Sequence, residues 1–198
     1  MSQKSAKLIL ILGGARSGKS SFAERLAVTS GKSVAFIATA TASDDDMRER
    51  IAHHRASRPA EWTTIEEPLD LPGAIQHAAQ VADVLLLDCM TLWLSNWFGA
   101  QGDANFDDPT LSTQYSHEVL QEIDRLLILV ASLDANKTLV IVSNEVGLGI
   151  VPMHALSRAY RDILGRVNQR LAQHAERVYL MLAGLAVDIK KLHDEASL

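Results

Sequence analysis

The chain has 198 residues, of which 47% are hydrophobic and 22% are charged, and its formal net charge is −5. These values are typical of a soluble globular protein, and we expect a single domain over residues 1–198. The acidic balance and the absence of a basic run argue against a nucleic-acid partner or an anionic membrane surface, because both usually bind a basic patch. No apolar stretch reaches the ~20 residues of a membrane-spanning helix, so we expect no stable membrane insertion.

The first residues and the cysteine content favour the cytoplasm. Residues 1–7 are polar and lack the apolar segment of a signal peptide. Cys89 is the only cysteine, so no internal disulfide can form, which fits a reducing compartment. Because Cys89 lies in an apolar run, we interpret it as a buried and unreactive thiol.

Short apolar runs alternate with longer amphipathic ones along the chain. In chain order the pattern predicts a strand at 7–12, a helix at 19–28, a strand at 33–39, a helix at 44–57, a strand at 62–66, a helix at 70–81, a strand at 83–88 and a short helix at 91–98. A polar loop at 99–109 follows, then a helix at 111–133, a strand at 138–143, a helix at 154–174 and a strand at 177–183. This alternation indicates an α/β fold with a mainly parallel sheet and helices on both faces.

The segment GGARSGKS matches the P-loop pattern Gly-x4-Gly-Lys-Ser/Thr between a predicted buried strand and a predicted helix. Glycine lets the backbone approach a phosphate closely, and successive N–H groups at a helix N-terminus attract an anion. We expect Lys19 at the β- and γ-phosphates and the Ser20 hydroxyl on Mg²⁺. The sequence therefore predicts a nucleoside triphosphate site with contacts from Gly13, Gly14, Ala15, Arg16, Ser17, Gly18, Lys19 and Ser20.

Two acidic residues come at the ends of predicted buried strands. Asp88 ends the most apolar of them, and the C-terminal ends of parallel strands border the ligand crevice. A carboxylate at that place is predicted to hold Mg²⁺, with a helix N-cap as the alternative. For Glu145 two roles remain open, one facing the crevice and one capping the backbone.

Two adjacent histidines lie in the helix predicted at residues 44–57. On a helix, Met47, Ile51 and His54 fall on one side, whereas His53 projects about 100° away from His54. This geometry favours His54 at the edge of an apolar stripe, and adjacent histidines diverge too far to share a metal ion. On these grounds alone, a surface position is favoured for His53 over a catalytic role.

From about residue 7 to residue 190, the chain resembles the bifunctional adenosylcobinamide kinase/adenosylcobinamide-phosphate guanylyltransferase family of cobalamin (vitamin B12) biosynthesis. The P-loop alone is generic, whereas the histidine block together with the NEVGLGIVP run is specific. The segments that carry the resemblance are GGARSGKS (13–20), IATA (37–40), DDDMRERIAHHRASRP (44–59), EWTTIEEP (61–68), LLLDCMTLWLSN (85–96), SNEVGLGIVP (143–152) and YRDILGRVNQRLA (160–172).

The resemblance implies two activities. The enzyme would phosphorylate adenosylcobinamide with ATP or GTP, and would then transfer GMP from GTP to that phosphate, which gives adenosylcobinamide-GDP. The resemblance assigns the covalent GMP-histidine of the family to His53. It also extends the nucleotide contacts to Ala38, Thr39, Ala40, His54, Arg55, Ala56, Ser57, Glu66 and Asp88.

The same resemblance implies a RecA-like P-loop NTPase fold and a homotrimer in which sites form between subunits. Adenosylcobinamide and its phosphate are then the small-molecule partners. At the position of Asp88 some relatives carry Glu, which keeps the carboxylate but changes its reach by one methylene. Trp93, Trp97 and the loop at 99–109 are candidates for the corrinoid pocket, with core or surface roles as the alternative.

Two other functions remain open from the residues alone. One is a P-loop kinase of another small molecule, which would form no covalent guanylate. The other is a RecA-like ATPase or nucleotide-dependent binding module, which would hydrolyse nucleotide slowly without an acceptor. The acidic charge balance argues against the nucleic-acid-binding form of the second.

Overall fold

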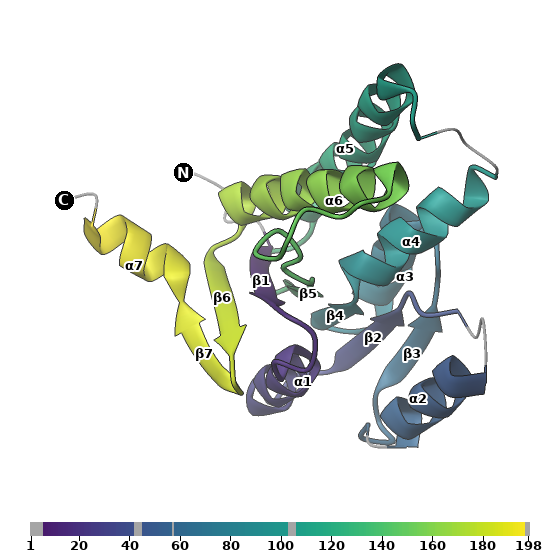
Figure 1. Cartoon of the computed structure of the whole chain (residues 1–198). Helices are drawn as coiled ribbons and strands as arrows, with labels where there is room; N and C mark the ends of the chain where they lie inside the picture. Colours follow the sequence, from purple (N-terminus) through teal and green to yellow (C-terminus); the bar gives the residue numbers. More distant parts are fainter. Residues whose placement is uncertain (1–5, 42–44, 57, 103–105, 197–198) are drawn as a thin grey trace.

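The computed structural model describes residues 6–41, 45–56, 58–102 and 106–196, and for residues 46, 47, 50, 51, 53, 54 and 109 it describes the backbone alone. Six strands alternate with helices in the predicted order, and every predicted boundary lies within two residues of the observed one (Figure 1). The elements are β1 (Lys7–Gly13), α1 (Lys19–Thr29), β2 (Val34–Ala38), α2 (Asp45–Ala56), β3 (Thr63–Glu66), α3 (Leu71–Val81), β4 (Val84–Asp88), α4 (Met90–Ala100), α5 (Pro109–Ser132), β5 (Thr138–Val142), α6 (Ala155–His174) and β6 (Arg177–Leu182).

The strands form a sheet in the order β3-β2-β4-β5-β1-β6, with a further strand at its end. All pairs among these six strands are parallel, which confirms the predicted sheet. The register aligns Asp88 of β4 with Ala38 of β2 and with Val142 of β5. The carboxyl ends of the central strands therefore meet at one edge of the sheet, where parallel α/β proteins bind ligands.

Each face of the sheet has its own apolar core. On one face α3, α4, α5 and α6 cover the larger cluster, and α1 and α2 lie on the other face (Figure 1). Alternate residues of a strand point to opposite faces, so Leu85 and Leu87 belong to the larger cluster and Leu86 to the smaller one. The smaller cluster is completed by Ala23 and Ala27 of α1, which pack this helix against the sheet.

Two elements at the end of the chain were missed by the sequence interpretation. β7 (Leu185–Asp188) pairs antiparallel with β6, and α7 (Ile189–Ala196) follows it. Ala183 and Gly184, with φ angles of 51° and 83°, make the turn between the two strands. β7 has only four residues and its side chains are largely exposed, and α7 has only eight residues and buries none of them, so both are shorter than the window over which apolar periodicity predicts an element.

Helix lengths and apolarity also bear on the membrane. Among the described residues, no helix is both long and apolar enough to cross a bilayer.

The loop predicted at 99–109 is shorter than expected, because α4 continues to Ala100 and α5 begins at Pro109. Asp108 caps α5 by accepting a hydrogen bond from the Thr110 backbone N–H at 2.8 Å.

We expect Lys190 of α7 to stabilise the end of α6. Its Nζ donates hydrogen bonds to the carbonyl oxygens of Ala172 at 2.9 Å, Gln173 at 3.3 Å and Ala175. These carbonyls lie where the helix dipole favours a cation. Lys190→Met should therefore lower the free energy of unfolding by about 1–2 kcal/mol in urea titrations followed by circular dichroism.

The adjacent lysine provides a matched control. Lys191 forms an exposed ion pair with Glu195 at 3.8 Å, and such a pair contributes less than about 0.5 kcal/mol. Lys191→Met should leave the urea midpoint nearly unchanged. Equal losses of stability in the two variants would contradict the role given to Lys190.

Candidate functional site

The P-loop follows β1 and leads into α1. A Cβ atom on Gly13 would lie 2.6 Å from the carbonyl oxygen of Met181 and 2.7 Å from Oγ of Ser17. Arg16 and Gly18 have positive φ angles of 59° and 93°, which turn the backbone towards the helix. Gly13 therefore has no room for a side chain unless β6 or the loop itself moves.

Two backbone hydrogen bonds tie the P-loop to neighbouring segments. The Glu145 N–H donates to the carbonyl oxygen of Gly13 at 3.0 Å, and the Gly184 N–H donates to that of Ser17 at 3.0 Å. Gly184 lies in the turn between β6 and β7. The hairpin that sequence patterns did not predict thus helps to hold the phosphate-binding loop.

Lys19 is the buried cation of the site. Its side chain is only 8% exposed, and Nζ donates a hydrogen bond to the carbonyl oxygen of Gly14 at 2.6 Å. Burial lowers the pKa of the Lys19 ammonium, and the negative charge of Asp88 opposes that shift. A buried cation whose backbone partner is a neutral carbonyl oxygen is suited to bind an anion in addition.

Asp88 ends β4 directly before α4. The N-cap of α4 is Cys89, without a side-chain cap hydrogen bond, so the helix-cap interpretation of Asp88 is wrong. The carboxylate instead contributes to a cavity that it shares with Ser20 and Lys19. Its role as a metal ligand stays a prediction.

One cavity of about 550 Å³ collects most of the predicted site at the carboxyl edge of the sheet. The predicted residues that line it are Ala15, Arg16, Ser17, Gly18, Lys19, Ser20, Ala38, Ala40, Arg55, Glu66 and Asp88. Four other predicted residues do not line it, namely Gly13, Gly14, Thr39 and Ala56. Segments far apart in the sequence therefore meet around the P-loop, and charged side chains of both signs face this cavity.

Thr39 has a structural place behind the cavity wall. Its side chain is fully buried, and its hydroxyl donates to the carbonyl oxygen of Cys89 and accepts from the Cys89 N–H, both at 2.8 Å. The Thr39 carbonyl oxygen accepts from Asn96 Nδ2 at 2.7 Å. These bonds join the ends of β2 and β4 and so position Asp88, the residue before Cys89.

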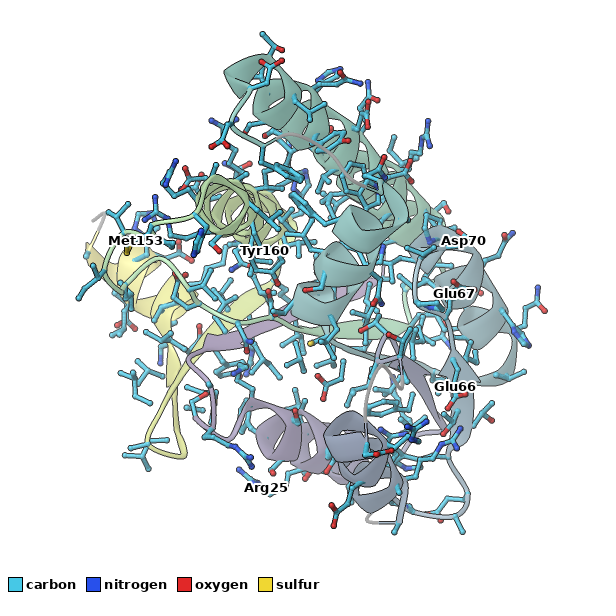
Figure 2. All side chains as sticks on the ribbon, turned by 45° about the vertical axis from the view of Figure 1, so that its right-hand side comes forward. Arg25, Glu66, Glu67, Asp70, Met153 and Tyr160 are labelled. Atoms are coloured by element: carbon cyan, nitrogen blue, oxygen red, sulfur yellow. The ribbon has the colours of Figure 1, made fainter. Side chains whose placement is uncertain are left out.

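The backbone of α2 carries both histidines of the predicted site. The side chains of His53 and His54 and the whole of Ser57 lie outside the described part of the structure, so their roles stay predictions. Arg55 of the same helix lines the cavity and forms an ion pair with Glu66, which is labelled in Figure 2 at the end of β3. The C-terminal end of α2 thus borders the cavity.

Arg58 is a cavity residue that the sequence interpretation missed. Its guanidinium lies 3.4 Å from the centre of the Phe36 ring. Burial lowers the pKa of Arg58, and the carboxylates of Glu24 and Asp88 oppose the shift. Arginine stays charged at neutral pH, so Arg58 adds to the positive charge that Arg16, Lys19 and Arg55 bring to the cavity.

The two roles left open for Glu145 are resolved by its hydrogen bond. Its Oε1 accepts from the Gly147 N–H at 2.7 Å, and the residue does not line the cavity. Glu145 therefore caps the backbone of the following loop. The cavity is lined instead by its neighbour Asn144, whose N–H donates to Thr91 Oγ1 at 2.9 Å.

Cys89 lies in the cavity wall, and its surroundings disfavour the thiolate form. Burial raises the pKa of its thiol to about 12, and the Asp88 carboxylate adds to that shift. At neutral pH the sulfur is therefore protonated and unreactive. The raised pKa agrees with the expected unreactive thiol, whereas the expected full burial is wrong, because Cys89 is half-buried and lines the cavity.

The two tryptophans proposed for a corrinoid pocket belong to the core side of the protein. Trp93 is 1% exposed, and its indole Nε1 donates to the carbonyl oxygen of Leu69 at 2.8 Å. Trp97 is half-buried and packs edge-on against Tyr115, with 5.2 Å between ring centres. Neither of them lines the P-loop cavity, so for Trp93 the core alternative is confirmed.

A family model described as cobinamide kinase / cobinamide phosphate guanyltransferase matches residues 9–189. The chain is 46% identical over 181 residues to the bifunctional adenosylcobalamin biosynthesis protein CobP of Pseudomonas aeruginosa, a match covering 91% of this chain and 96% of that protein. It is 42% identical over 186 residues to the bifunctional adenosylcobalamin biosynthesis protein CobU of Salmonella typhimurium, covering 92% of this chain and 99% of that protein.

The solved structure of an ATPase from the type III secretion system of pathogenic bacteria is similar in fold. It matches 96% of this chain and 58% of its own at 11% identity, with a TM-score of 0.51. This likeness concerns the fold alone and agrees with the predicted RecA-like P-loop architecture. With its P-loop, its cavity and relatives of nearly equal length, the chain belongs to the cobinamide kinase / cobinamide phosphate guanyltransferase family.

Proposed function

We propose that the P-loop cavity serves both reactions of the family with one set of phosphate-binding groups. The first reaction phosphorylates adenosylcobinamide with ATP or GTP. The second transfers GMP from GTP to adenosylcobinamide phosphate and gives adenosylcobinamide-GDP. The observation that carries the proposal is the meeting of Lys19, Ser20 and Asp88 in one cavity of about 550 Å³, a volume in the range of small-molecule sites.

The kinase step is a phosphoryl transfer. The hydroxyl oxygen of the aminopropanol arm attacks the γ-phosphorus and loses its proton, and the bond from this phosphorus to the oxygen bridging to the β-phosphate breaks. Negative charge grows on that bridging oxygen, which becomes part of the nucleoside diphosphate. Lys19 and the P-loop N–H groups are placed to stabilise this charge.

The guanylyltransferase step uses His53 as the nucleophile. A ring nitrogen of neutral His53 attacks the α-phosphorus of GTP, a P–N bond forms, and pyrophosphate leaves with the electron pair of the broken P–O bond. An imidazole of ordinary pKa is largely neutral at pH 7, so it needs little activation. A phosphate oxygen of adenosylcobinamide phosphate then attacks the same phosphorus, and His53 is released.

Support for His53 comes from its place in the chain. It stands two residues before Arg55, which lines the cavity, and within the block of residues that carries the family resemblance. Arg55 and Arg58 bring positive charge to the side of the cavity where α2 ends. Such charge favours binding of the α-phosphate and stabilises the phosphorus centre as it is attacked.

Mg²⁺ fits the oxygen donors of the cavity. Ser20 and Asp88 supply a hydroxyl and a carboxylate, ligand types that Mg²⁺ binds together with phosphate oxygens and water. Among the described residues, no group of three or more His, Cys, Asp or Glu side chains could hold a metal ion by itself. The ion would therefore arrive with the nucleotide, and when bound it neutralises charge on the β- and γ-phosphates.

We also place the enzyme in the cytoplasm as a homotrimer. One cysteine without an internal partner fits a reducing compartment. The segment after β5 exposes apolar side chains in a row, with Leu148 at 85% and Ile150 at 96% exposure. Contiguous exposed apolar surface of this kind marks protein interfaces, and the segment belongs to the NEVGLGIVP run.

Lys19→Met should abolish nucleotide binding without unfolding the protein. Loss of a charged hydrogen bond of about 3 kcal/mol should weaken GTP binding at least about a hundredfold in calorimetric titrations. Because the ammonium is buried, the free energy of unfolding should stay within about 1 kcal/mol of wild type or rise. Lys191→Met, outside the cavity, should bind GTP normally, and retained affinity in Lys19→Met would refute the phosphate site.

His53→Asn should separate the two reactions. Wild-type protein incubated with GTP labelled at the α-phosphate should gain acid-labile, alkali-stable label, and γ-labelled GTP should give none. In His53→Asn the covalent label should disappear and guanylyl transfer should fall at least about a thousandfold, while phosphorylation of adenosylcobinamide persists. His77→Asn, an exposed histidine of α3, is the matched control. Label retained in His53→Asn would contradict the assignment of His53 as the nucleophile.

Ile150→Glu should dissociate the trimer, because a charge in an apolar interface leaves an unpaired buried carboxylate. Sedimentation velocity should show a shift from the trimer towards the monomer. Ile128 on α5 is 72% exposed, and Ile128→Glu should leave the sedimentation coefficient unchanged. A wild-type monomer, or a variant that sediments like wild type, would contradict this interface.

A further inference from the structure

A second cavity of about 900 Å³ lies between α4, α6 and the segments that lead into α5 and α6. Its wall differs in chemistry from that of the P-loop cavity. Phe98, Phe106 and Tyr160 form an aromatic side, and Met153 stands at the rim with 91% exposure. Figure 2 shows Tyr160 where α6 faces α4, and Met153 further out on the preceding loop.

The aromatic side of this cavity is held in place by packing. The rings of Phe98 and Phe106 stack with 5.2 Å between centres and 28° between planes, and Tyr160 lies 6.0 Å from Phe98. The Tyr160 hydroxyl donates to the carbonyl oxygen of Thr91 at 2.7 Å. The cavity thus presents fixed aromatic faces, and Asp107 is the one carboxylate in its lining. Such a wall suits a broad and largely uncharged organic group.

One face of α4 leads from the first cavity to the second. Thr91 lines the P-loop cavity, whereas Ser95 and Gly99 line the second one. Residues four apart share a helix face. With a rise of 1.5 Å per residue, Ser95 lies about 6 Å and Gly99 about 12 Å along the helix from Thr91. The two cavities are therefore neighbours along a single surface.

Cobinamide has two parts that match this pair of cavities. Its corrin ring is a wide macrocycle with apolar methyl groups and amide arms, and its aminopropanol hydroxyl ends an arm of seven bonds. Extended, such an arm reaches about 9 Å. That length exceeds the distance of about 6 Å along the helix from Ser95 to Thr91, so an arm that starts beside Ser95 joins a ring in the second cavity to a hydroxyl at the P-loop.

We propose that the second cavity binds the corrin ring of the acceptor, with the aminopropanol arm lying along α4 from Ser95 to Thr91. This assignment rests on the proposed function, since it places the acceptor of both reactions. Aromatic rings and Met153 contact the methyl-rich ring, and the exposed hydroxyl of Ser157 is available to its amides, whereas the Ser95 hydroxyl is hydrogen-bonded to Tyr160. The P-loop cavity then holds the nucleotide and not the corrin ring.

The test fills the second cavity without touching the first. A Cβ atom on Gly99 would meet no other atom within 4 Å, so the fold has room for a large side chain there. Gly99→Trp should occupy the space proposed for the ring. The matched control is Ala100→Trp, which adds the same bulk at an exposed position of α4 that lines neither cavity. Ser157→Trp, from the exposed start of α6, fills the cavity from its other wall and serves if Gly99→Trp does not fold.

Binding is measured by equilibrium dialysis of adenosylcobinamide against the full-length protein, followed by the visible absorbance of the corrin. Gly99→Trp and Ser157→Trp should raise the Kd for adenosylcobinamide at least about tenfold. Ala100→Trp should stay within about twofold of wild type. The Kd for GTP and the covalent labelling from α-labelled GTP should be unchanged in all three variants.

Several outcomes would overturn the assignment. One is a Kd for adenosylcobinamide in both cavity-filling variants equal to that of Ala100→Trp. Another is a loss of GTP affinity in these variants as large as their loss of adenosylcobinamide affinity. A changed sedimentation coefficient in these variants would assign the cavity to a subunit contact instead. Wild-type protein that neither phosphorylates adenosylcobinamide nor takes label from GTP would refute the proposed function itself, which separates the two failures.

Discussion

The close packing of the P-loop against β6 is the constraint from which the active site follows. Gly13 passes so near the carbonyl oxygen of Met181 that a Cβ atom would come within 2.6 Å of it. This contact fixes where the loop leaves the sheet. The parallel register then brings Asp88 to the same edge, since Asp88 pairs with Val142 of β5, which pairs with Ile11 of β1, two residues before Gly13. A position set by backbone contact thus determines where the charged groups of the cavity meet.

Burial of Lys19 beside Asp88 explains why the cavity favours phosphate. An ammonium that is 8% exposed is costly to keep charged, and one carboxylate and one carbonyl oxygen offset part of that cost. Arg58 adds a further positive charge, held over the Phe36 ring. In the proposed nucleotide site, the phosphates would supply further negative charge to these cations.

Sequence patterns predicted the parts of the site that are local, and missed those that depend on the fold. The P-loop is a contiguous motif, and Asp88 could be placed because it ends an apolar strand. Arg58 and Thr39 gave no such signal, since their roles depend on Phe36 and on Cys89, which only the folded sheet brings close. β7 and α7, with four and eight residues, are too short for a periodic pattern to identify them. The side chain of His53 lies outside the described atoms, so its assignment rests on the family resemblance.

Two adjoining cavities also bear on the order of the reactions. The kinase product is the acceptor of the guanylyl transfer, and both reactions act on the same end of the same arm. With the ring held against Phe98 and Tyr160, the end of the arm meets the γ-phosphorus of a nucleotide in the first reaction. In the second reaction the same end of the arm meets the guanylyl group. The large, apolar part of the acceptor supplies binding energy common to both steps, and the charged cavity supplies the stabilisation that differs between them. One P-loop cavity can in this way support two transfers, of which the first takes the γ-phosphoryl group of a triphosphate and the second takes its nucleoside monophosphate part.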